Sequence, residues 1–168
     1  MPKIIVNLES KLLEEARKQV SEAGYEAVTI RSVAAACGVG VGTVYNYFPS
    51  KDDLLASYML RDWKDCVAVI TEVSRDARDP REVAHCIYHQ LCRFAGMHES
   101  IFRDAAAAAN FAGSFSRYHS LLRSQLAQPL GGFCRDSFRA EFVAEALLTW
   151  TMDGKEFDQI YGILQHLF

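Results

Sequence analysis

The stretch Thr29–Lys51, TIRSVAAACGVGVGTVYNYFPSK, constrains the fold of this chain more than any other segment. Its apolar residues Ile30, Val33 and Ala34 share one face of a short helix, at spacings i, i+3 and i+4. The glycines around Val39 then supply a turn, because glycine tolerates positive φ and close helix packing. A second helix of about two turns, Val41–Phe48, follows and carries almost no charge. Two short helices across a glycine-containing turn are typical of a helix-turn-helix, whose second helix enters the major groove of DNA.

Capping residues support these boundaries. Thr29 stands immediately before the first helix, where its hydroxyl can accept a hydrogen bond from an unpaired backbone N–H. Pro49 ends the second helix and Ser50 begins the next, with Asp53 at the third position of that helix. Serine followed by an acidic residue at this spacing predicts a capping box.

Residues on both sides of this stretch complete a longer pattern. It comprises Leu12, Leu13, Ala16, Gly24-Tyr25, Thr29, Val33-Ala34, Gly38-Val39, Gly42-Thr43-Val44-Tyr45, Tyr47-Phe48 and Lys51–Leu54. In this order the residues resemble the DNA-binding domain of TetR-family transcriptional repressors. The resemblance covers about the first third of the chain and implies a helix-turn-helix domain over residues 1–50. Gly40 departs from the pattern, since such repressors often have a capping serine there, but glycine is an acceptable cap by itself.

The resemblance and the residue types together predict the DNA contacts. Val44 and Phe48, at i and i+4, are expected in the core, so Tyr45 and Tyr47 cannot both join them and at least one faces DNA. Asn46 either hydrogen-bonds an adenine edge or faces solvent. Lys51 matches a lysine that contacts backbone phosphate in the family. The predicted DNA-binding residues are Thr29, Arg31, Val41, Gly42, Thr43, Tyr45, Asn46, Tyr47 and Lys51.

Charge alone does not predict DNA binding. The chain has 168 residues, half of them apolar, and a net charge of −3. Up to Lys51, six basic residues oppose five acidic ones, a net charge of +1, which leaves −4 for the rest. A DNA-binding domain so nearly neutral is expected to act through the geometry of a few contacts rather than through a basic coat.

The five cysteines are scattered and form no CxxC pair, which is typical of reduced thiols in the cytosol. The opening MPKIIVNLES lacks the long apolar core of a signal peptide, and no run approaches the roughly 18 apolar residues of a membrane span. We therefore expect a cytoplasmic protein that does not enter the membrane.

The remainder, residues 51–168, is predicted to be a second, all-helical domain, which gives an all-α chain of about nine helices. Helices are expected at 51–73, at 80–95 with Gly96 as its stop, at 99–110, at 114–128 ending before Pro129, at 136–152 and at 155–168. The last two carry aromatic stripes, and the resemblance implies that they form a four-helix bundle with a second subunit. The expected interface residues are Phe138, Phe142, Ala146, Trp150, Phe157, Ile160, Tyr161 and Leu164.

The resemblance also implies that a small effector binds this second domain and disturbs the spacing of the paired DNA-binding domains. An aromatic, weakly charged set of side chains favours a hydrophobic or aromatic ligand. The candidate pocket residues are Trp63, Cys66, Tyr88, His89, Cys92, Phe102, Phe111, Phe115, Tyr118, His119 and Trp150. For each of them, a place in the ordinary core is the competing interpretation.

Two alternatives remain open. His85, His89 and Cys92 share one helix face at i, i+4 and i+7, a pattern that can bind zinc or copper, and a thiol-based redox response is a related option. A small His/Cys enzyme is the competing class, but the sequence contains no GxSxG, HExxH or glycine-rich phosphate loop. The sequence therefore predicts a non-enzymatic regulator without a cofactor. We expect a homodimeric repressor that reads a palindromic operator and is released by a small hydrophobic ligand.

Overall fold

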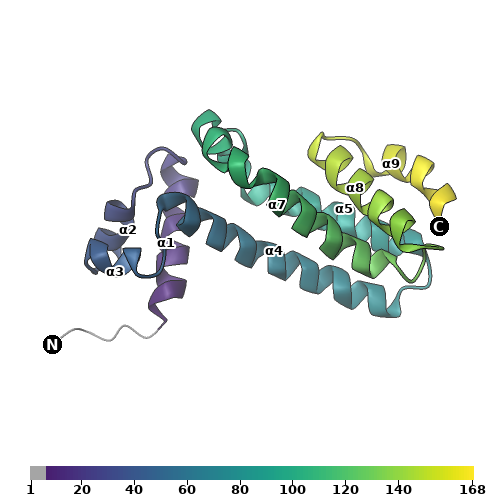
Figure 1. Cartoon of the computed structure of the whole chain (residues 1–168), viewed down its shortest axis with the longest axis horizontal. Coiled ribbons are helices and arrows are strands. Elements are labelled where there is room, and N and C mark those ends of the chain that lie inside the picture. The colour runs from purple at the N-terminus through teal and green to yellow at the C-terminus, as the bar shows by residue number, and fades with distance from the viewer. Residues whose placement is uncertain (1–6) are drawn as a thin grey trace. The chain divides into compact units, whose positions relative to one another are not determined.

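The computed structural model describes the backbone of residues 7–168 and the side chains of residues 7–111 and 118–168. In this part of the chain all regular structure is helical (Figure 1). None of the described helices combines the length and the apolar character needed to cross a membrane. The helices are α1 (Leu8–Ala23), α2 (Ile30–Ala36), α3 (Val41–Tyr45), α4 (Lys51–Asp76), α5 (Pro80–Met97), α6 (Glu99–Phe102), α7 (Ala105–Leu130), α8 (Ser137–Met152), α9 (Phe157–Leu164) and the 3₁₀-helix η1 (Gln165–Leu167).

The helices belong to two compact units. Unit 1 comprises Met1–Arg61 and His98–Ala112, and unit 2 comprises Asp62–Met97 and Gly113–Phe168. This division differs from the expected boundary at residue 50. The first turns of α4, all of α6 and the start of α7 belong to the same unit as the helix-turn-helix.

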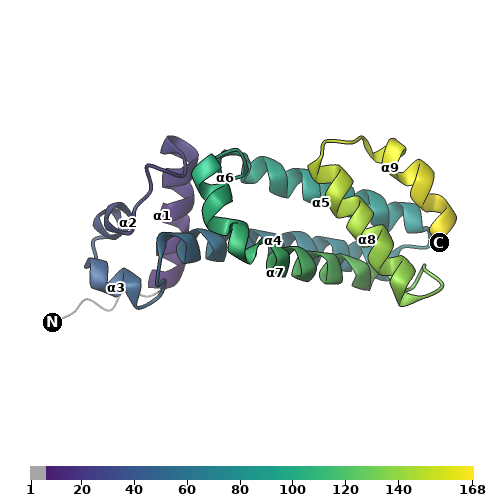
Figure 2. The same cartoon turned by 45° about the horizontal axis from the view of Figure 1, so that its top comes forward.

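Unit 1 is built on α1, which packs against α2 and α6 (Figure 2). The apolar stripe of α1, with Leu12 and Ala16 fully buried, meets Val33 of α2 and Val44 of α3 in one core. Leu54 and Leu55 from the first turn of α4 complete this core. Ala107 of α7 is also fully buried there, because a small side chain lets α7 approach closely.

Two predicted boundaries in the middle of the chain were wrong. The helix α5 runs through Gly96 to Met97, and α6 is a single turn rather than a helix over 99–110. The alanine run belongs to α7, because the Asp104 carboxylate accepts hydrogen bonds from the N–H groups of Ala106 and Ala107, both at 2.9 Å. These bonds satisfy N–H groups that a new helix leaves unpaired, and so they start α7 at Ala105.

The ends of two further helices also differ from the prediction. Pro129 lies inside the last turn of α7, which ends at Leu130. At the carboxyl end of the chain, α9 stops at Leu164 and continues as η1.

Unit 2 packs α5 against α8, with α9 lying against both of them (Figure 1). Val83, Ile87 and Leu91 recur on the buried face of α5, and Val143 and Leu147 are fully buried on α8. The Asp79 side chain caps the start of α5, since its carboxylate accepts a hydrogen bond from the Arg81 N–H at 2.8 Å. Within unit 2, Trp63 of α4 packs edge-on against Phe94 of α5 and donates from Nε1 to the Gln125 side chain of α7 at 2.7 Å.

Candidate DNA-binding site

Reciprocal hydrogen bonds fix the first turn of α2. The Thr29 hydroxyl accepts from the Ser32 N–H at 2.9 Å, and the Ser32 hydroxyl oxygen accepts from the Thr29 N–H at 3.0 Å. The Ser32 hydroxyl in turn donates to the Gln19 side chain of α1 at 2.6 Å. The predicted cap at Thr29 is therefore present, and it ties α2 to the supporting helix α1.

The turn between α2 and α3 depends on one residue with positive φ. Gly38 has φ 67°, a region that side chains with a Cβ rarely adopt. The next residue, Val39, donates from its N–H to the Ala34 carbonyl at 3.0 Å, which closes the carboxyl end of α2. Gly40 then has φ −70° and ψ 146° and precedes α3 without a side chain to cap it.

The segment 44–48, at the end of α3 and just after it, has a buried face and an exposed one. Val44 is fully buried and Phe48 is 4% exposed, as their spacing predicts. Tyr45 and Tyr47 are both exposed, by 50% and 46%, and Asn46 lies between them on the surface. The described structure thus presents two phenol hydroxyls and one amide along a short, uncharged segment.

The α3 helix is shorter than predicted and ends in a tightened turn. The helix stops at Tyr45 rather than Phe48, and the Tyr47 N–H bonds to the Val44 carbonyl three residues back, at 3.0 Å. Such i→i−3 bonds tighten a last helical turn. Pro49, which has no N–H to donate, follows directly after this turn.

The start of α3 leaves room for close approach. Gly42 is exposed, and a Cβ built on it would meet no atom within 4 Å. Val41 and Thr43 are half-buried. Thr29 and Arg31, at the start of α2, are exposed. Together with Tyr45, Asn46 and Tyr47, these predicted DNA-binding residues all lie within unit 1.

Lys51 occupies a defined position at the start of α4. Its Nζ lies 3.8 Å from the centre of the Tyr25 ring, a cation–π contact. Ser50 caps this helix by accepting from the Asp53 N–H at 3.1 Å and donating its own hydroxyl proton to the Asp53 carboxylate at 2.7 Å. The predicted Ser50–Asp53 pair is present, although the carboxylate receives the serine hydroxyl rather than a backbone N–H.

The sequence did not point to the hydrogen-bond network beneath Lys51. The Tyr25 hydroxyl donates to the Asp52 carboxylate at 2.6 Å and accepts from the Asn110 side-chain amide at 2.7 Å. Burial and the bond to Asp52 raise the pKa of the Tyr25 phenol, so the hydroxyl keeps its proton. Asn110 belongs to α7 and is 85 residues from Tyr25 in sequence, so no periodicity or local motif links the two.

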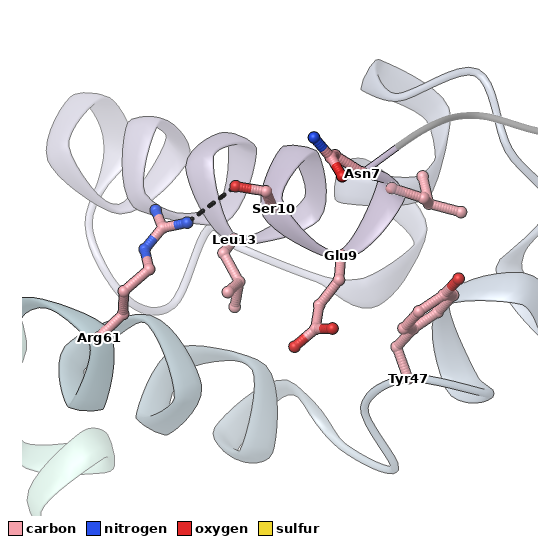
Figure 3. Close-up of a pocket in the computed structure, with 7 residues that line it drawn as sticks. Asn7, Glu9, Ser10, Leu13, Tyr47 and Arg61 are labelled. Carbon is pink, nitrogen blue, oxygen red and sulfur yellow. Dashed lines mark hydrogen bonds between the residues drawn. The ribbon is translucent and has the colours of Figure 1, made fainter.

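A cleft of about 430 Å³ lies beside the exposed end of α3 (Figure 3). The Arg61 guanidinium donates to the Ser10 hydroxyl at 3.0 Å on one side, and Figure 3 shows the Glu9 carboxylate between Arg61 and Tyr47. The cleft is lined by Asn7, Leu8, Glu9, Ser10, Leu13, Tyr47 and Arg61. Its lining includes two opposite charges and belongs to unit 1, unlike the apolar effector pocket expected in residues 51–168.

The structure distributes the predicted pocket residues over both units and several environments. Phe102 and Phe111 belong to unit 1, where Phe111 packs against the core and Phe102 is 45% exposed. In unit 2, Trp63 and Cys66 are core residues, while His89, Cys92 and Trp150 are exposed. Tyr88, Tyr118 and His119 are half-buried, and the side chain of Phe115 lies outside the described residues.

The face of α5 considered for a metal carries two histidines in contact. The His85 and His89 rings lie 4.4 Å apart, and His85 also meets the Phe157 ring of α9 at 4.7 Å. Burial, with help from His89 and Arg81, lowers the pKa of His85. Among the described residues, no group of three or more His, Cys, Asp or Glu side chains is placed to hold a metal ion.

Burial changes the expected subunit interface. Phe157, Ile160, Tyr161 and Leu164 of α9 are all buried within unit 2, where α9 packs against α5 and α8. The expectation that these four face a second copy does not fit this placement, because the amphipathic stripe of α9 is already covered by its own chain. Phe138, Phe142 and Trp150 of α8 are exposed by 72%, 52% and 48%, and Ala146 is half-buried.

A polar cluster lies on the exposed side of α8. The Glu145 carboxylate contacts Nε2 of His119 at 2.8 Å and accepts the Thr149 hydroxyl at 2.9 Å. Arg123 of α7 is 3.5 Å from the same carboxylate. Burial opposes ionisation of Glu145, but the hydrogen bonds outweigh it and hold the pKa of the carboxyl below its usual value.

Comparison with known proteins adds independent information. The sequence profile described as "Bacterial regulatory proteins, tetR family" matches residues 12–58. The HTH-type transcriptional repressor KstR of Rhodococcus jostii (strain RHA1) is 34% identical over 120 residues, which cover 61% of this chain and 56% of that protein. The chain therefore spans about half the length of this curated relative, and less of other KstR proteins.

Solved structures extend the similarity to the whole fold. A transcriptional regulator SCO7518 from Streptomyces coelicolor A3(2) superposes with a TM-score of 0.69 at 17% identity, covering 94% of this chain and 96% of its own. The TetR family repressor AlkX from Dietzia sp. strain DQ12-45-1b gives 0.69 at 14% identity, over 96% and 93% of the two chains. At such identities the likeness concerns the fold. The resemblance to the TetR family is therefore confirmed: residues 12–58 match its profile, and the chain shares its all-helical fold with solved transcriptional regulators.

Proposed function

We propose that the protein is a homodimeric repressor that binds a palindromic DNA operator through α3 and is released by a small hydrophobic or aromatic ligand. The observation that carries the DNA-binding part is the exposed row Tyr45, Asn46 and Tyr47, held in place by the buried Val44 and Phe48. A row of phenol and amide groups at the end of an uncharged helix suits hydrogen bonds to phosphates and base edges. These three side chains lie on the surface and therefore do not contribute to the packing of the core.

The anchors beside α3 complete the proposed contact. Arg31 projects from the first turn of α2 and is exposed, and Lys51 begins α4 on the Tyr25 ring. Each cation that meets a phosphate releases counterions, so affinity falls as the salt concentration rises. Few cations are available in this segment, and we therefore propose that one DNA-binding unit alone binds weakly.

A second copy is the proposed partner for α8. Its exposed Phe138, Phe142 and Met152 lie opposite the buried face that packs inside unit 2. Apolar side chains exposed on one helix face favour a protein partner over water. On a twofold dimer, two DNA-binding units read two half-sites about 34–36 Å apart, or a multiple of that spacing.

The effector is proposed to bind unit 2. Trp63 and Phe94 pack against each other in the core there, and the side-chain oxygens of Gln90 and Thr151 are buried with no hydrogen-bond partner among the described residues. Apolar sites with a few polar groups are typical of pockets for small molecules. To release DNA, the ligand must bind the arrangement that cannot bind DNA more tightly than the one that can.

DNA selection followed by a salt titration tests the proposal. Duplexes are selected from a random pool with the wild-type protein, and the affinity of the best one is measured by fluorescence anisotropy at several salt concentrations. We expect Arg31→Ala to weaken binding and to reduce the salt slope by about one per lost phosphate contact. Tyr47→Ala is expected to weaken binding about 10-fold without changing the slope, because it removes a neutral donor.

The matched control is Arg135→Ala, which removes an exposed arginine from unit 2. It is expected to bind the selected duplex like the wild type. Selection that enriches no sequence, together with no salt-sensitive binding, would contradict the proposed function.

A further inference from the structure

Lys51 contacts the ring of Tyr25, and the Tyr25 hydroxyl is in turn hydrogen-bonded to two other side chains. The Tyr25 ring lies under the Lys51 Nζ at 3.8 Å, and the Tyr25 side chain is only 3% exposed. At the far end of the ring, the hydroxyl bridges Asp52 of α4 and Asn110 of α7. All four residues belong to unit 1.

The donor and the acceptor of each of these hydrogen bonds follow from the groups involved. An amide nitrogen only donates, so Asn110 Nδ2 gives a proton to the Tyr25 oxygen. The Tyr25 hydroxyl then directs its own proton to the Asp52 carboxylate, at 2.6 Å. Donation by Asn110 therefore strengthens the bond by which Tyr25 holds Asp52.

Asp52 is the carboxylate that competes most directly for Lys51. It is the next residue in the chain, and Asp104 and Glu26 also act on the Lys51 charge. Burial lowers the pKa of the Lys51 ammonium, while these three carboxylates raise it. A carboxylate engaged by Tyr25 is less available to pair with the ammonium, which leaves Lys51 on the ring and available to a phosphate.

We propose that Tyr25 and Asn110 are positioning residues for the DNA contact of Lys51: they hold Asp52 and the aromatic ring so that the ammonium faces the DNA backbone. This inference rests on the proposed function, since it assumes that Lys51 meets a phosphate. The helix α7 lies outside the matched residues 12–58. In this proposal α7 contributes to DNA binding through Asn110, without contacting DNA.

The test is a double-mutant cycle on the selected duplex, measured by anisotropy at several salt concentrations. Tyr25→Phe keeps the ring and removes the hydroxyl, and Asn110→Ala removes the amide. Each is expected to weaken binding about 3- to 10-fold, the effect of one lost hydrogen bond. Each is also expected to lower the salt slope toward that of Lys51→Ala, because the ammonium no longer faces the phosphate.

The decisive comparison is made in the Lys51→Ala background. There, Tyr25→Phe and Asn110→Ala are expected to cause no further loss, because the residue through which they act is absent. Gln128→Ala, which removes an exposed amide from α7 in unit 2, serves as the control and is expected to bind like the wild type.

Two results overturn the inference while leaving the proposed function intact. One is wild-type affinity in both single variants. The other is an equal loss with and without Lys51, which indicates a general effect on the fold rather than positioning. Absence of salt-sensitive binding in the wild-type protein itself contradicts the proposed function and the inference together.

Discussion

Thr29 and Ser32 cap the first turn of α2 reciprocally, each hydroxyl accepting the backbone N–H of the other at 2.9 and 3.0 Å. The Ser32 hydroxyl also donates a hydrogen bond to the Gln19 side chain of α1. Arg31 is the second residue of α2 and lies in the turn that this cap fixes, and the opposite face of the helix is buried. The orientation of the proposed anchor therefore depends on the cap.

Loss of this cap is expected to lower both stability and DNA affinity. Thr29→Ala removes the acceptor for the Ser32 N–H and is expected to cost about 1 kcal/mol of unfolding free energy. Thr29→Ser keeps the acceptor and is expected to retain most of that stability. Urea unfolding of the three proteins measures the difference, and equal midpoints for all three would show that the cap contributes nothing.

A serine at Gly40 is expected to stabilise the start of α3. The φ and ψ of Gly40, −70° and 146°, suit any residue, and a Cβ there would lie 3.8 Å from the Thr43 hydroxyl, an ordinary contact. Gly40→Ser adds a capping hydroxyl and reduces the freedom of the unfolded chain, for a gain of about 0.5–1 kcal/mol. Gly38→Ser, at φ 67°, is the contrasting variant and is expected to destabilise. Thermal unfolding of the two variants measures whether each substitution raises or lowers the stability.

Charge on the exposed face of α8 is expected to separate the proposed dimer. Phe138→Glu and Phe142→Glu replace side chains that are 72% and 52% exposed, so the fold of one chain loses little. Sedimentation velocity is expected to show a monomer for the double variant and a dimer for the wild type. Phe102→Glu, an exposed phenylalanine of unit 1, is the control and is expected to remain dimeric. A double variant that sediments like the wild type would exclude this face as the interface.

Stability is expected to fall as the solution is acidified below about pH 6.5. Burial, with Arg17 nearby, lowers the pKa of His98 from 6.5 to about 4, and its side chain is only 1% exposed. Between these values the unfolded chain binds a proton that the folded chain does not, so acid favours unfolding. The expected contribution of His98 is a loss of about 2 kcal/mol between pH 7 and pH 5.

Urea unfolding at a series of pH values measures this loss. In His98→Leu that part of the pH dependence is expected to disappear. His166→Asn, which removes an exposed histidine of η1, is expected to keep it. A pH dependence that survives unchanged in His98→Leu would assign the effect to other groups.

The parts of the site that the sequence predicted are those built from local interactions. The Thr29 cap, the Gly38 turn and the burial of Val44 and Phe48 each depend on residues within about four positions of one another. The break between α6 and α7 was missed because alanine favours a helix on either side of it. The carboxylate of Asp104 decides where the new helix begins.

Contacts distant in sequence could not be predicted in the same way. An amphipathic stripe such as Phe157, Ile160, Tyr161 and Leu164 shows that one face of α9 is covered, but not whether its own chain or another one covers it. The bond between Asn110 and Tyr25 exists only because the start of α7 belongs to unit 1, and no local motif links the two residues.

Hydroxyl-radical footprinting of the wild-type protein on its selected duplex tests the central claim most directly. Two α3 helices on a twofold dimer are expected to protect two symmetric backbone patches, with half-site centres about 34–36 Å apart or at a multiple of that spacing. Phe138→Glu/Phe142→Glu is expected to lose both patches at the same protein concentration, because one unit binds weakly. A single unsymmetric patch, or protection that the double variant retains unchanged, would contradict the account.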